Sequence, residues 1–529
     1  MEGLMFDPTQ TFWGQQMKHY YVQETEIMKE NVVAFPSNHL EINGVSFTSE
    51  EILHCLRENE DGDARLFKKI HNGKLVFDHA ENAWYKYQDP HWEIDALEEV
   101  VASVQQVINV YKFEARRQHA LAKIAMKEGE TTQEKEHNNN LKFLQKRIKS
   151  LQTAYRKKKV DYLSRVGTGL KGDEWDNDPW LLGCKDGVVD LRTGILRAGR
   201  PEDYIRRVTS TSWKGIDAPC LEFMRMLEGI FAGDKEIIEF IQRLMGYSLL
   251  GSNPLHLFII LYGAMGRNGK NTFIETIQAV LGQYASKAKV ELLLKQRFAQ
   301  HSGAADADKM ALRGCRLVYI SETNDGDMIS NDKIKSLSGD KTIRTRAPYS
   351  KHSIEFATTF KIFLLTNFKP KVHTGLDNGL WERIILVPFN LSFVHHDPVF
   401  PHERRADKDL PEKLLLEAPG ILAWMVKGFL DYQANGLRIP EVVRDATKEY
   451  RHEISILDRF LDSEWCVIGE NHSVQADKFY RAYERFCSQS GIPPISQTKF
   501  GKEMKKKFQC EKGATVKYLG VDVIEGIEG

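Results

Sequence analysis

The stretch LFIILYGAMGRNGKNTFIETIQAVLG (residues 257–282) decides the fold. Its apolar run 257–262 predicts a buried strand, its glycine-rich middle a tight loop, and the residues from about Lys270 onward a helix. Glycines let backbone N–H groups come close to an anion, and a helix N-terminus favours negative charge. A lysine at this point reaches phosphate oxygens. The stretch therefore predicts a cradle for the phosphates of a nucleotide.

The loop departs from the usual G-x-x-x-x-G-K-[ST] pattern at two points. Ala264 occupies the first glycine position and Gly263 stands one residue earlier, so which of the two touches phosphate is open. Asn271 follows the lysine, where a hydroxyl normally reaches Mg²⁺. Its amide oxygen is also a hard ligand, and Thr272 is the alternative. We expect ATP contacts from Gly263, Gly266, Asn268, Gly269, Lys270, Asn271 and Thr272, with Asn271 as a metal ligand.

Three later segments carry polar groups that a phosphate cradle needs. The apolar run 317–320 leads to Glu322, placed to hold Mg²⁺ and to orient water. The run FKIFLLT leads to Asn367, a candidate sensor of the γ-phosphate, and Arg383 precedes a further apolar run. Alone, these residues have plainer explanations as a strand end, a turn asparagine and a surface charge. Beside the loop they are our catalytic candidates: Glu322, Asn367 and Arg383, with Glu322 also a metal ligand.

Composition sets the broad class. The chain has 529 residues, of which 28% are charged and 42% hydrophobic, with a net charge of zero. That is an ordinary soluble composition, with room for roughly three or four domains. The seven cysteines contain no C-x-x-C pair, so neither a zinc knuckle nor a disulfide framework is predicted. Without a signal sequence or long apolar run, we expect no membrane association and a cytoplasmic location in a bacterial host cell.

The region before the loop becomes helical between about residues 96 and 165. We interpret its polar tract KEGETTQEKEHNNN (127–140) as a solvated connection. Beyond it, apolar residues at helical spacing leave Lys146, Arg147, Lys149 and the run RKKK (156–159) on the other faces. These basic residues are either a solvated surface or a nucleic-acid contact.

The last 50 or so residues predict a helix, a turn, a second helix and a hairpin, which resembles a winged-helix module. The second helix carries lysines mostly away from its apolar face. In a winged helix that face would meet the backbone of duplex DNA, although a solubilising surface is the alternative. The DNA-binding candidates here are Lys499, Lys502 and Lys506.

Taken in order, these motifs resemble the superfamily 3 helicases, and most closely the primase-helicases of phages, plasmids and poxviruses. The resemblance implies an AAA+ ring, usually a hexamer, that draws single-stranded DNA through a central pore. It assigns Lys270 as the P-loop lysine, Glu322 as the Walker B acid, Asn367 as the sensor and Arg383 as a finger reaching the neighbouring subunit's nucleotide. The segment IKSLSGDKTIRTRAPYSKHSIEF (334–356) resembles the family's signature segment and hairpin, which would place Lys351 and His352 near a tip facing the pore.

Many relatives in that family carry an N-terminal primase-polymerase, whose chemistry needs clustered carboxylates with a histidine. The residues before the ATPase part show no such set, and we interpret DGD (61–63) as a loop. We therefore predict no primer synthesis and allow for a separate primase or other replication proteins as partners.

The sequence thus predicts a multidomain α/β chain with an AAA+ P-loop core. Its expected function is an ATP- and Mg²⁺-dependent helicase acting on single-stranded and forked DNA, in replication of a phage, plasmid or mobile element. Two alternatives of other classes stay open: a non-motor DNA-binding initiator or regulator, and a defence NTPase. The expected parts are a small N-terminal region (1–70), an α+β accessory domain (71–215), the ATPase domain (216–395), a helical extension (396–463) and the winged helix (464–529).

Overall fold

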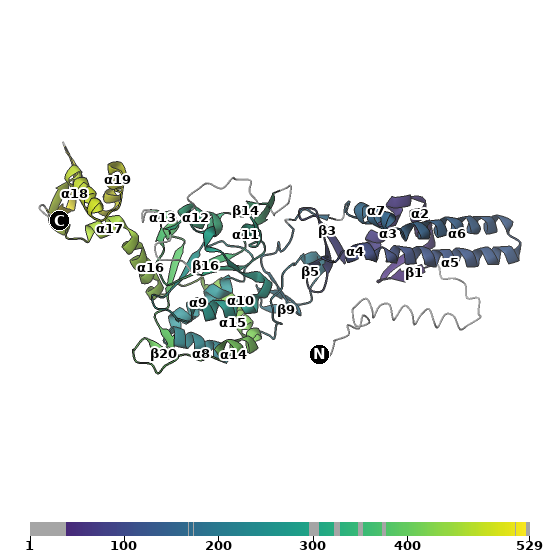
Figure 1. The fold of residues 1–529 in the computed structure, drawn as a ribbon, viewed down its shortest axis with the longest axis horizontal. Helices are drawn as coiled ribbons and strands as arrows, with labels where there is room; N and C mark the ends of the chain where they lie inside the picture. The colour runs from purple at the N-terminus through teal and green to yellow at the C-terminus, as the bar shows by residue number, and fades with distance from the viewer. Residues whose placement is uncertain are drawn as a thin grey trace, which may run out of the picture. The chain divides into compact units, whose positions relative to one another are not determined.

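The stretch 257–282 forms the predicted strand, loop and helix in the computed structural model of the chain, shown in Figure 1. The chain folds as two units, one from residues 39–72 and 96–167 and the other from residues 73–95 and those from 169 on. The five-part division expected from the sequence stays a prediction. The structure describes residues 39–167, 169–172, 174–295, 306–321, 328–346, 353–372, 377–513 and 515–524.

A parallel sheet forms the centre of the second unit. Its strand order is β11-β12-β16-β10-β18 within the described residues. Both faces are covered, because alternate residues of β10 enter two different apolar cores. Ile259 and Leu261 face the helices α8, α9, α10 and α15, whereas Phe258 and Ile260 face the side of α12, α13 and α16. The strands are β10 (Phe258–Tyr262), β11 (Ala285–Ala288), β12 (Leu317–Ser321), β16 (Lys361–Thr366) and β18 (Ile384–Pro388).

This sheet gives the chain the mixed α/β fold that the sequence predicts. The covering helices are α8 (Leu221–Ile230), α9 (Lys235–Tyr247), α10 (Lys270–Leu281), α12 (Asn331–Gly339), α13 (Asn378–Trp381), α14 (Leu410–Leu416), α15 (Ala418–Asn435) and α16 (Glu441–Ile454). Short elements complete this part: α11 (Ala307–Met310), β13 (Met328–Ile329), β17 (Lys371–Val372), β19 (Ser392–Val394) and β20 (Glu403–Arg405).

A hairpin lies between β12 and β16 in the sequence, as expected from the resemblance. Its strands β14 (Thr342–Thr345) and β15 (Ile354–Ala357) pair antiparallel. The second unit also contains two small sheets whose strands precede the parallel sheet in sequence. These are β5-β4-β3-β6, from β3 (Leu75–Asp78), β4 (Ala83–Tyr87), β5 (Trp92–Ile94) and β6 (Gly169–Leu170), and β7-β8-β9, from β7 (Leu181–Cys184), β8 (Gly187–Asp190) and β9 (Ile195–Arg197).

The first unit is mainly helical, and two sequence interpretations fail in it. The polar tract 127–140 is not a connection, because only Gly129 and Glu130 separate α5 from α6. The two helices lie side by side (Figure 1), and His137 Nδ1 lies 2.7 Å from Gln118 Oε1, so pairing with α5 holds polar residues in a helix. The elements are β1 (His39–Ile42), β2 (Val45–Thr48), α2 (Ser49–Arg57), α3 (Asn59–Ile70), α4 (Glu99–Ser103), α5 (Gln105–Glu128), α6 (Thr131–Leu151) and α7 (Ala154–Ser164).

The DGD sequence at 61–63 is the second error, since it lies within α3 rather than in a loop. Asp63 is fully buried and accepts hydrogen bonds from Arg147 (2.7 Å), Arg156 (2.6 Å) and Tyr111 (2.8 Å). A buried carboxylate is stable only when it is paired in this way. Arg147 and Arg156 therefore serve as its internal counter-ions and not as the solvated or DNA-facing charges considered from the sequence.

The C-terminal part has the predicted order of helix, turn, helix and hairpin, together with a strand that the sequence pattern missed. That strand, β21, pairs antiparallel with β23 across a register shift between Ile468 and Ser473. Its polar middle, GENHS, lacks the alternation that marks a strand. The elements are α17 (Ile456–Leu461), β21 (Cys466–Gln475), α18 (Ala476–Gln489), α19 (Gln497–Lys507), β22 (Cys510–Lys512) and β23 (Val516–Val523).

The cysteines and the hydropathy of the helices bear on two further expectations from the sequence. All seven cysteines are unpaired, which agrees with the absence of a predicted disulfide framework. Among the described helices, none combines the length and the apolar character needed to cross a membrane.

Candidate nucleotide-binding site

Lys270 is the first residue of α10, and its side chain is only 5% exposed. Its Nζ lies 2.6 Å from Asn268 Oδ1, 2.7 Å from Asn367 Oδ1 and 3.3 Å from the Gly263 carbonyl oxygen. These acceptors are neutral, and burial lowers the pKa of Lys270 from 10.5 to about 8. Within the described part of the chain, no carboxylate pairs with this ammonium. An anion such as phosphate would supply the missing counter-charge.

The start of α10 is open to an anion. Gly269 precedes it with φ at 80°, in the left-handed region that glycine adopts without strain. No side chain caps the first turn, so its backbone N–H groups and the positive end of the helix dipole remain for a ligand. With twelve residues, α10 is long enough to carry that dipole. The open start of α10 and the buried Lys270 therefore lie together, and their use as a phosphate cradle stays a prediction.

The structure bears on the open choice between Gly263 and Ala264. The Gly263 N–H donates to the Thr366 carbonyl at 3.2 Å, and its own carbonyl accepts from Lys270. A Cβ atom at this position would lie 2.5 Å from Asn268 Nδ2 and 2.7 Å from the Phe389 carbonyl oxygen. Glycine is therefore required here for close packing. Gly263 is buried and the exposed residues of the loop begin at Ala264, and a phosphate contact from Gly263 stays a prediction.

Contacts from β19 hold the rest of the loop. The Phe393 N–H donates to the Arg267 carbonyl at 2.8 Å, and Ser392 Oγ donates to the Gly266 carbonyl at 3.1 Å. The buried Asn268 side chain donates to the Met265 carbonyl. Because both ends of the turn are fixed by hydrogen bonds, the loop is already arranged before a ligand binds.

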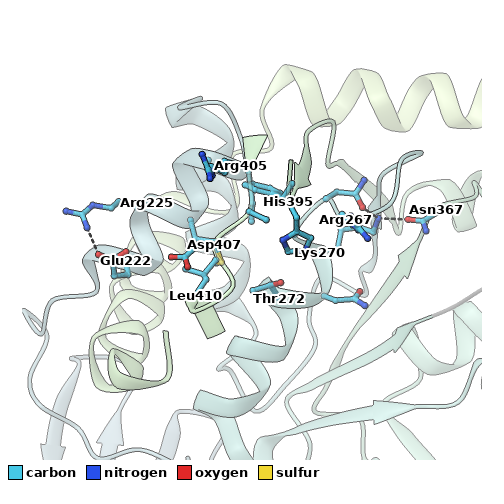
Figure 2. A pocket seen from close by; sticks show the side chains of 18 residues that line it. Glu222, Arg225, Arg267, Lys270, Thr272, Asn367, His395, Arg405, Asp407 and Leu410 are labelled. Carbon is cyan, nitrogen blue, oxygen red and sulfur yellow. Dashed lines mark hydrogen bonds and ion pairs between the residues drawn. The ribbon is translucent and has the colours of Figure 1, made fainter. Parts of the chain in front are cut away.

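The loop opens on a cavity of about 600 Å³, within the usual range of roughly 300–1,000 Å³ for small-molecule sites. Figure 2 shows Lys270, Thr272 and Asn367 on its wall, with the hydrogen bond that ends at Asn367 drawn as a dashed line. Asn271 also lines it. The cavity thus brings together the end of the loop after β10, the first turn of α10 and Asn367, the predicted sensor, which follows β16; Gly263 and Gly266 do not line it.

The opposite wall was missed by sequence reasoning. It is formed by α8 and by residues 393–410, which lie far from the loop in sequence. Its apolar part matches the usual lining of a site for a flat ring, and its cations suit a charged ligand. No sequence signal separates these side chains from ordinary core or surface residues. They are Met226, Ile230, Phe393 and Leu410, together with the polar side chains Glu222, Arg225, His395, Arg405 and Asp407. Figure 2 labels Leu410 and these five polar residues.

Of the other two catalytic candidates, Arg383 is not among the residues that line this cavity. Glu322 follows β12, next to β16 in the sheet, and lies outside the described residues. Arg383 donates from Nη1 to the Lys335 carbonyl (2.9 Å) and to Ser338 Oγ (3.2 Å), at the C-terminal end of α12. Its part as a finger toward a neighbouring subunit stays a prediction.

Of the five DNA-binding candidates, two lie outside the described residues and three lie on α19. Lys351 and His352 lie between β14 and β15 in the sequence, outside the described residues, so their place in a hairpin tip stays a prediction. The lysines of α19 are exposed, but Lys506 pairs with Glu503 at 2.7 Å. Lys499 and Lys502 have no acidic partner in the described part of the chain, which leaves their charge available to a polyanion.

Two protein families match the chain. Residues 64–232 match the family described as "D5 N terminal like". Residues 261–383, which include Lys270 and Asn367, match a "Family of unknown function (DUF5906)".

The chain is also similar to viral proteins. It is 30% identical over 404 residues to "Putative helicase L207/L206" of Acanthamoeba polyphaga mimivirus, covering 72% of this chain and 40% of that protein. "Putative helicase 022R" of Frog virus 3 (isolate Goorha) is 24% identical over 391 residues, covering 60% and 39%. "Putative helicase 121R" of Invertebrate iridescent virus 3 is 21% identical over 472 residues, covering 80% and 49%. The chain therefore spans less than half the length of each of these relatives.

Among solved structures, two of the apo C-terminal region of NrS-1 are similar to the chain, with 8% and 9% identity and TM-scores of 0.44 and 0.47. The first similarity covers 87% of this chain and 99% of the solved chain, and the second covers 85% of this chain and 96% of the solved chain. The chain is thus similar to a family described as "D5 N terminal like" and to viral proteins that are named putative helicases.

Proposed function

We propose that the chain is an ATP-dependent DNA helicase of the superfamily 3, AAA+ type, which assembles into a ring and moves along single-stranded DNA. The observation that carries the proposal is the position of Lys270. It is a buried ammonium at the open start of α10, whose partners among the described residues are neutral oxygens, and it faces a cavity of about 600 Å³. This arrangement matches the phosphate end of a nucleoside triphosphate, and the apolar wall from α8 is available to the base.

The residues present also fit a magnesium ion. Asn271 and Thr272 line the cavity beside Lys270 and carry oxygen atoms suited to a hard cation. Glu322, one residue beyond the end of β12, is our proposed second ligand and the group that orients the attacking water. When bound, Mg²⁺ would neutralise charge on the β- and γ-phosphate oxygens. Lys270 and the amides of α10 would hold those oxygens, and Asn367 would contact the γ-phosphate.

The remaining parts of the chain support a motor acting on DNA. The β14–β15 hairpin is the element on which we place Lys351 and His352, facing a central pore, and α19 is a basic surface for duplex DNA next to a fork. Arg383 is our candidate for a group that reaches the neighbouring subunit. Because the similar proteins belong to viruses, we propose a role in replication of a virus or another mobile element. The bacterial host expected from the sequence gains no support from these relatives.

A non-motor initiator with the same ATP site is the main competing function, and the winged-helix arrangement would suit it as well. The rate of ATP hydrolysis with and without single-stranded DNA separates the two. A motor should hydrolyse faster when DNA is added, whereas an assembly switch should not respond. Lys270→Ala should abolish hydrolysis, and Lys287→Ala, which removes an exposed lysine from β11, should leave it unchanged. DNA-independent hydrolysis by the wild type would contradict the motor.

A further inference from the structure

Helix α7 in the first unit has two different faces. Val160 and Ser164 are buried, whereas Tyr155 is 70% exposed and Tyr162 is 64% exposed. The two tyrosines are seven residues apart, which is about two helical turns and roughly 10 Å along the axis. They therefore lie on the same side of the helix. Lys158 and Lys159 fall between them at helical spacing, and we call these four residues the α7 strip.

The strip lies in a strongly basic part of the chain. Residues 141–166 contain nine Lys or Arg residues and only one acidic residue, Asp161. The three arginines are neutralised internally, since Arg147 and Arg156 pair with Asp63 and Arg165 pairs with Asp161. The lysines are left without a carboxylate partner among the described residues. They are Lys142, Lys146 and Lys149 on α6, and Lys157, Lys158 and Lys159 on α7.

Exposed tyrosines and lysines in this order have a specific chemical use. A single exposed aromatic residue is common on protein surfaces, but two on one helical face with positive charges between them match the chemistry of unpaired nucleotides. Bases stack on aromatic rings, and ammonium groups contact the backbone phosphates. A protein partner fits less well, because lysine is depleted at protein–protein interfaces.

We propose that the α7 strip binds single-stranded nucleic acid, with bases stacked on Tyr155 and Tyr162 and phosphates contacted by the lysines. Lys159 Nζ already lies 5.5 Å from the centroid of the Tyr155 ring, so the positive charge and the aromatic platform adjoin. Duplex DNA is a poor ligand for the rings, because its bases are already stacked on each other. This contact goes beyond the proposed motor, since it lies in the first unit and needs no nucleotide.

The test is the binding of the full chain to a fluorescent oligo(dT) of about twenty nucleotides, measured by anisotropy over a series of salt concentrations without ATP. The double variant Tyr155→Ala/Tyr162→Ala should bind about tenfold more weakly or worse, with little change in salt dependence. The double variant Tyr155→Phe/Tyr162→Phe keeps the rings and should bind like the wild type. Both should bind duplex DNA normally.

A comparison of two triple lysine variants separates binding at the α7 strip from nonspecific attraction between positive charge and DNA. Replacing Lys158 and Lys159 of the strip, together with the adjacent Lys157, by alanine should weaken binding and reduce the slope of log affinity against log salt by about two. Replacing three exposed lysines of α5 in the same unit should change affinity less than about twofold; these are Lys112, Lys123 and Lys127. Equal losses from both triple variants would overturn the proposal.

Two other results would also overturn it. One is unchanged oligo(dT) binding by the tyrosine-to-alanine variant. The other is a changed sedimentation coefficient of that variant, which would identify the strip as a contact between subunits. Lys270→Ala should bind oligo(dT) like the wild type without nucleotide, so failure of the motor and failure of the strip are distinguishable.

Discussion

Asn367 Oδ1 lies 2.7 Å from Lys270 Nζ, across from the start of α10 and at the end of the neighbouring strand β16. The two residues are 97 positions apart in sequence. Parallel pairing of β10 with β16 brings them together, because the carboxyl ends of parallel strands meet at one edge of a sheet. The predicted phosphate-binding residue and the predicted sensor thus share one hydrogen bond.

Changing Asn367 to aspartate should weaken ATP binding more than changing it to alanine. The new carboxylate would occupy the place of a neutral oxygen beside Lys270, pair with the ammonium and repel the γ-phosphate. Asn367→Ala should instead bind ATP within a few-fold of the wild type but hydrolyse it slowly. Titration with a fluorescent ATP analogue gives the affinities, and phosphate release gives the rates. Equal affinities for the two variants would contradict the contact.

ATP binding should weaken as the pH rises above about 8. Burial lowers the pKa of Lys270 to about 8, so the free protein loses this proton above that pH, while bound phosphate requires it. Affinity should therefore be constant below pH 8 and fall by up to about tenfold per pH unit above it. The matched variant Lys270→Arg stays charged over this range, so whatever affinity it retains should not vary. A flat wild-type profile to about pH 9.5 would exclude this pKa for the binding residue.

Magnesium dependence should distinguish Asn271 from Thr272. If the Asn271 amide oxygen takes the place of the usual hydroxyl, Asn271→Ala should raise the Mg²⁺ concentration needed for half-maximal hydrolysis and leave ATP binding largely intact. Thr272→Ala is the matched variant, because both side chains line the cavity in the first turn of α10. Hydrolysis measured over a Mg²⁺ titration is the readout. A larger shift for Thr272→Ala would reverse the assignment.

Arg383 should act on a neighbouring subunit. Arg383→Ala should bind ATP but lose hydrolysis, by roughly 10³- to 10⁵-fold if it is a complete finger. Its hydrogen bonds to α12 also allow a purely structural role. Mixing Arg383→Ala with Lys270→Ala separates the two, because a mixed ring contains interfaces with one intact lysine and one intact arginine. Recovery of hydrolysis on mixing is the expected result, and none would be seen if Arg383 acts only within its own subunit.

The parts predicted correctly from sequence are those decided by local pattern. The run 257–262, the glycines and Lys270 form strand, loop and helix because each segment follows its own preference. The basic α19 also forms at the expected place, because its apolar residues recur at helical spacing. In such segments neighbouring residues carry most of the information.

The parts that were missed depend on distant partners. Asp63 is buried within a helix only because Arg147 and Arg156, more than eighty positions away, neutralise it. The wall of the cavity comes from α8 and residues 393–410, whose apolar side chains resemble ordinary core. For Gly263, the steric reason for glycine is the packing of Asn268 and the Phe389 carbonyl, which no motif reports.

Unwinding of a forked DNA duplex tests the central claim most directly. The full chain with ATP and Mg²⁺ should displace the shorter strand of a fork that carries a single-stranded tail. The chain without ATP should not, and neither should Lys270→Ala, whereas Lys287→Ala should unwind like the wild type. A wild-type protein that hydrolyses ATP in the presence of the fork yet never displaces a strand would contradict the account.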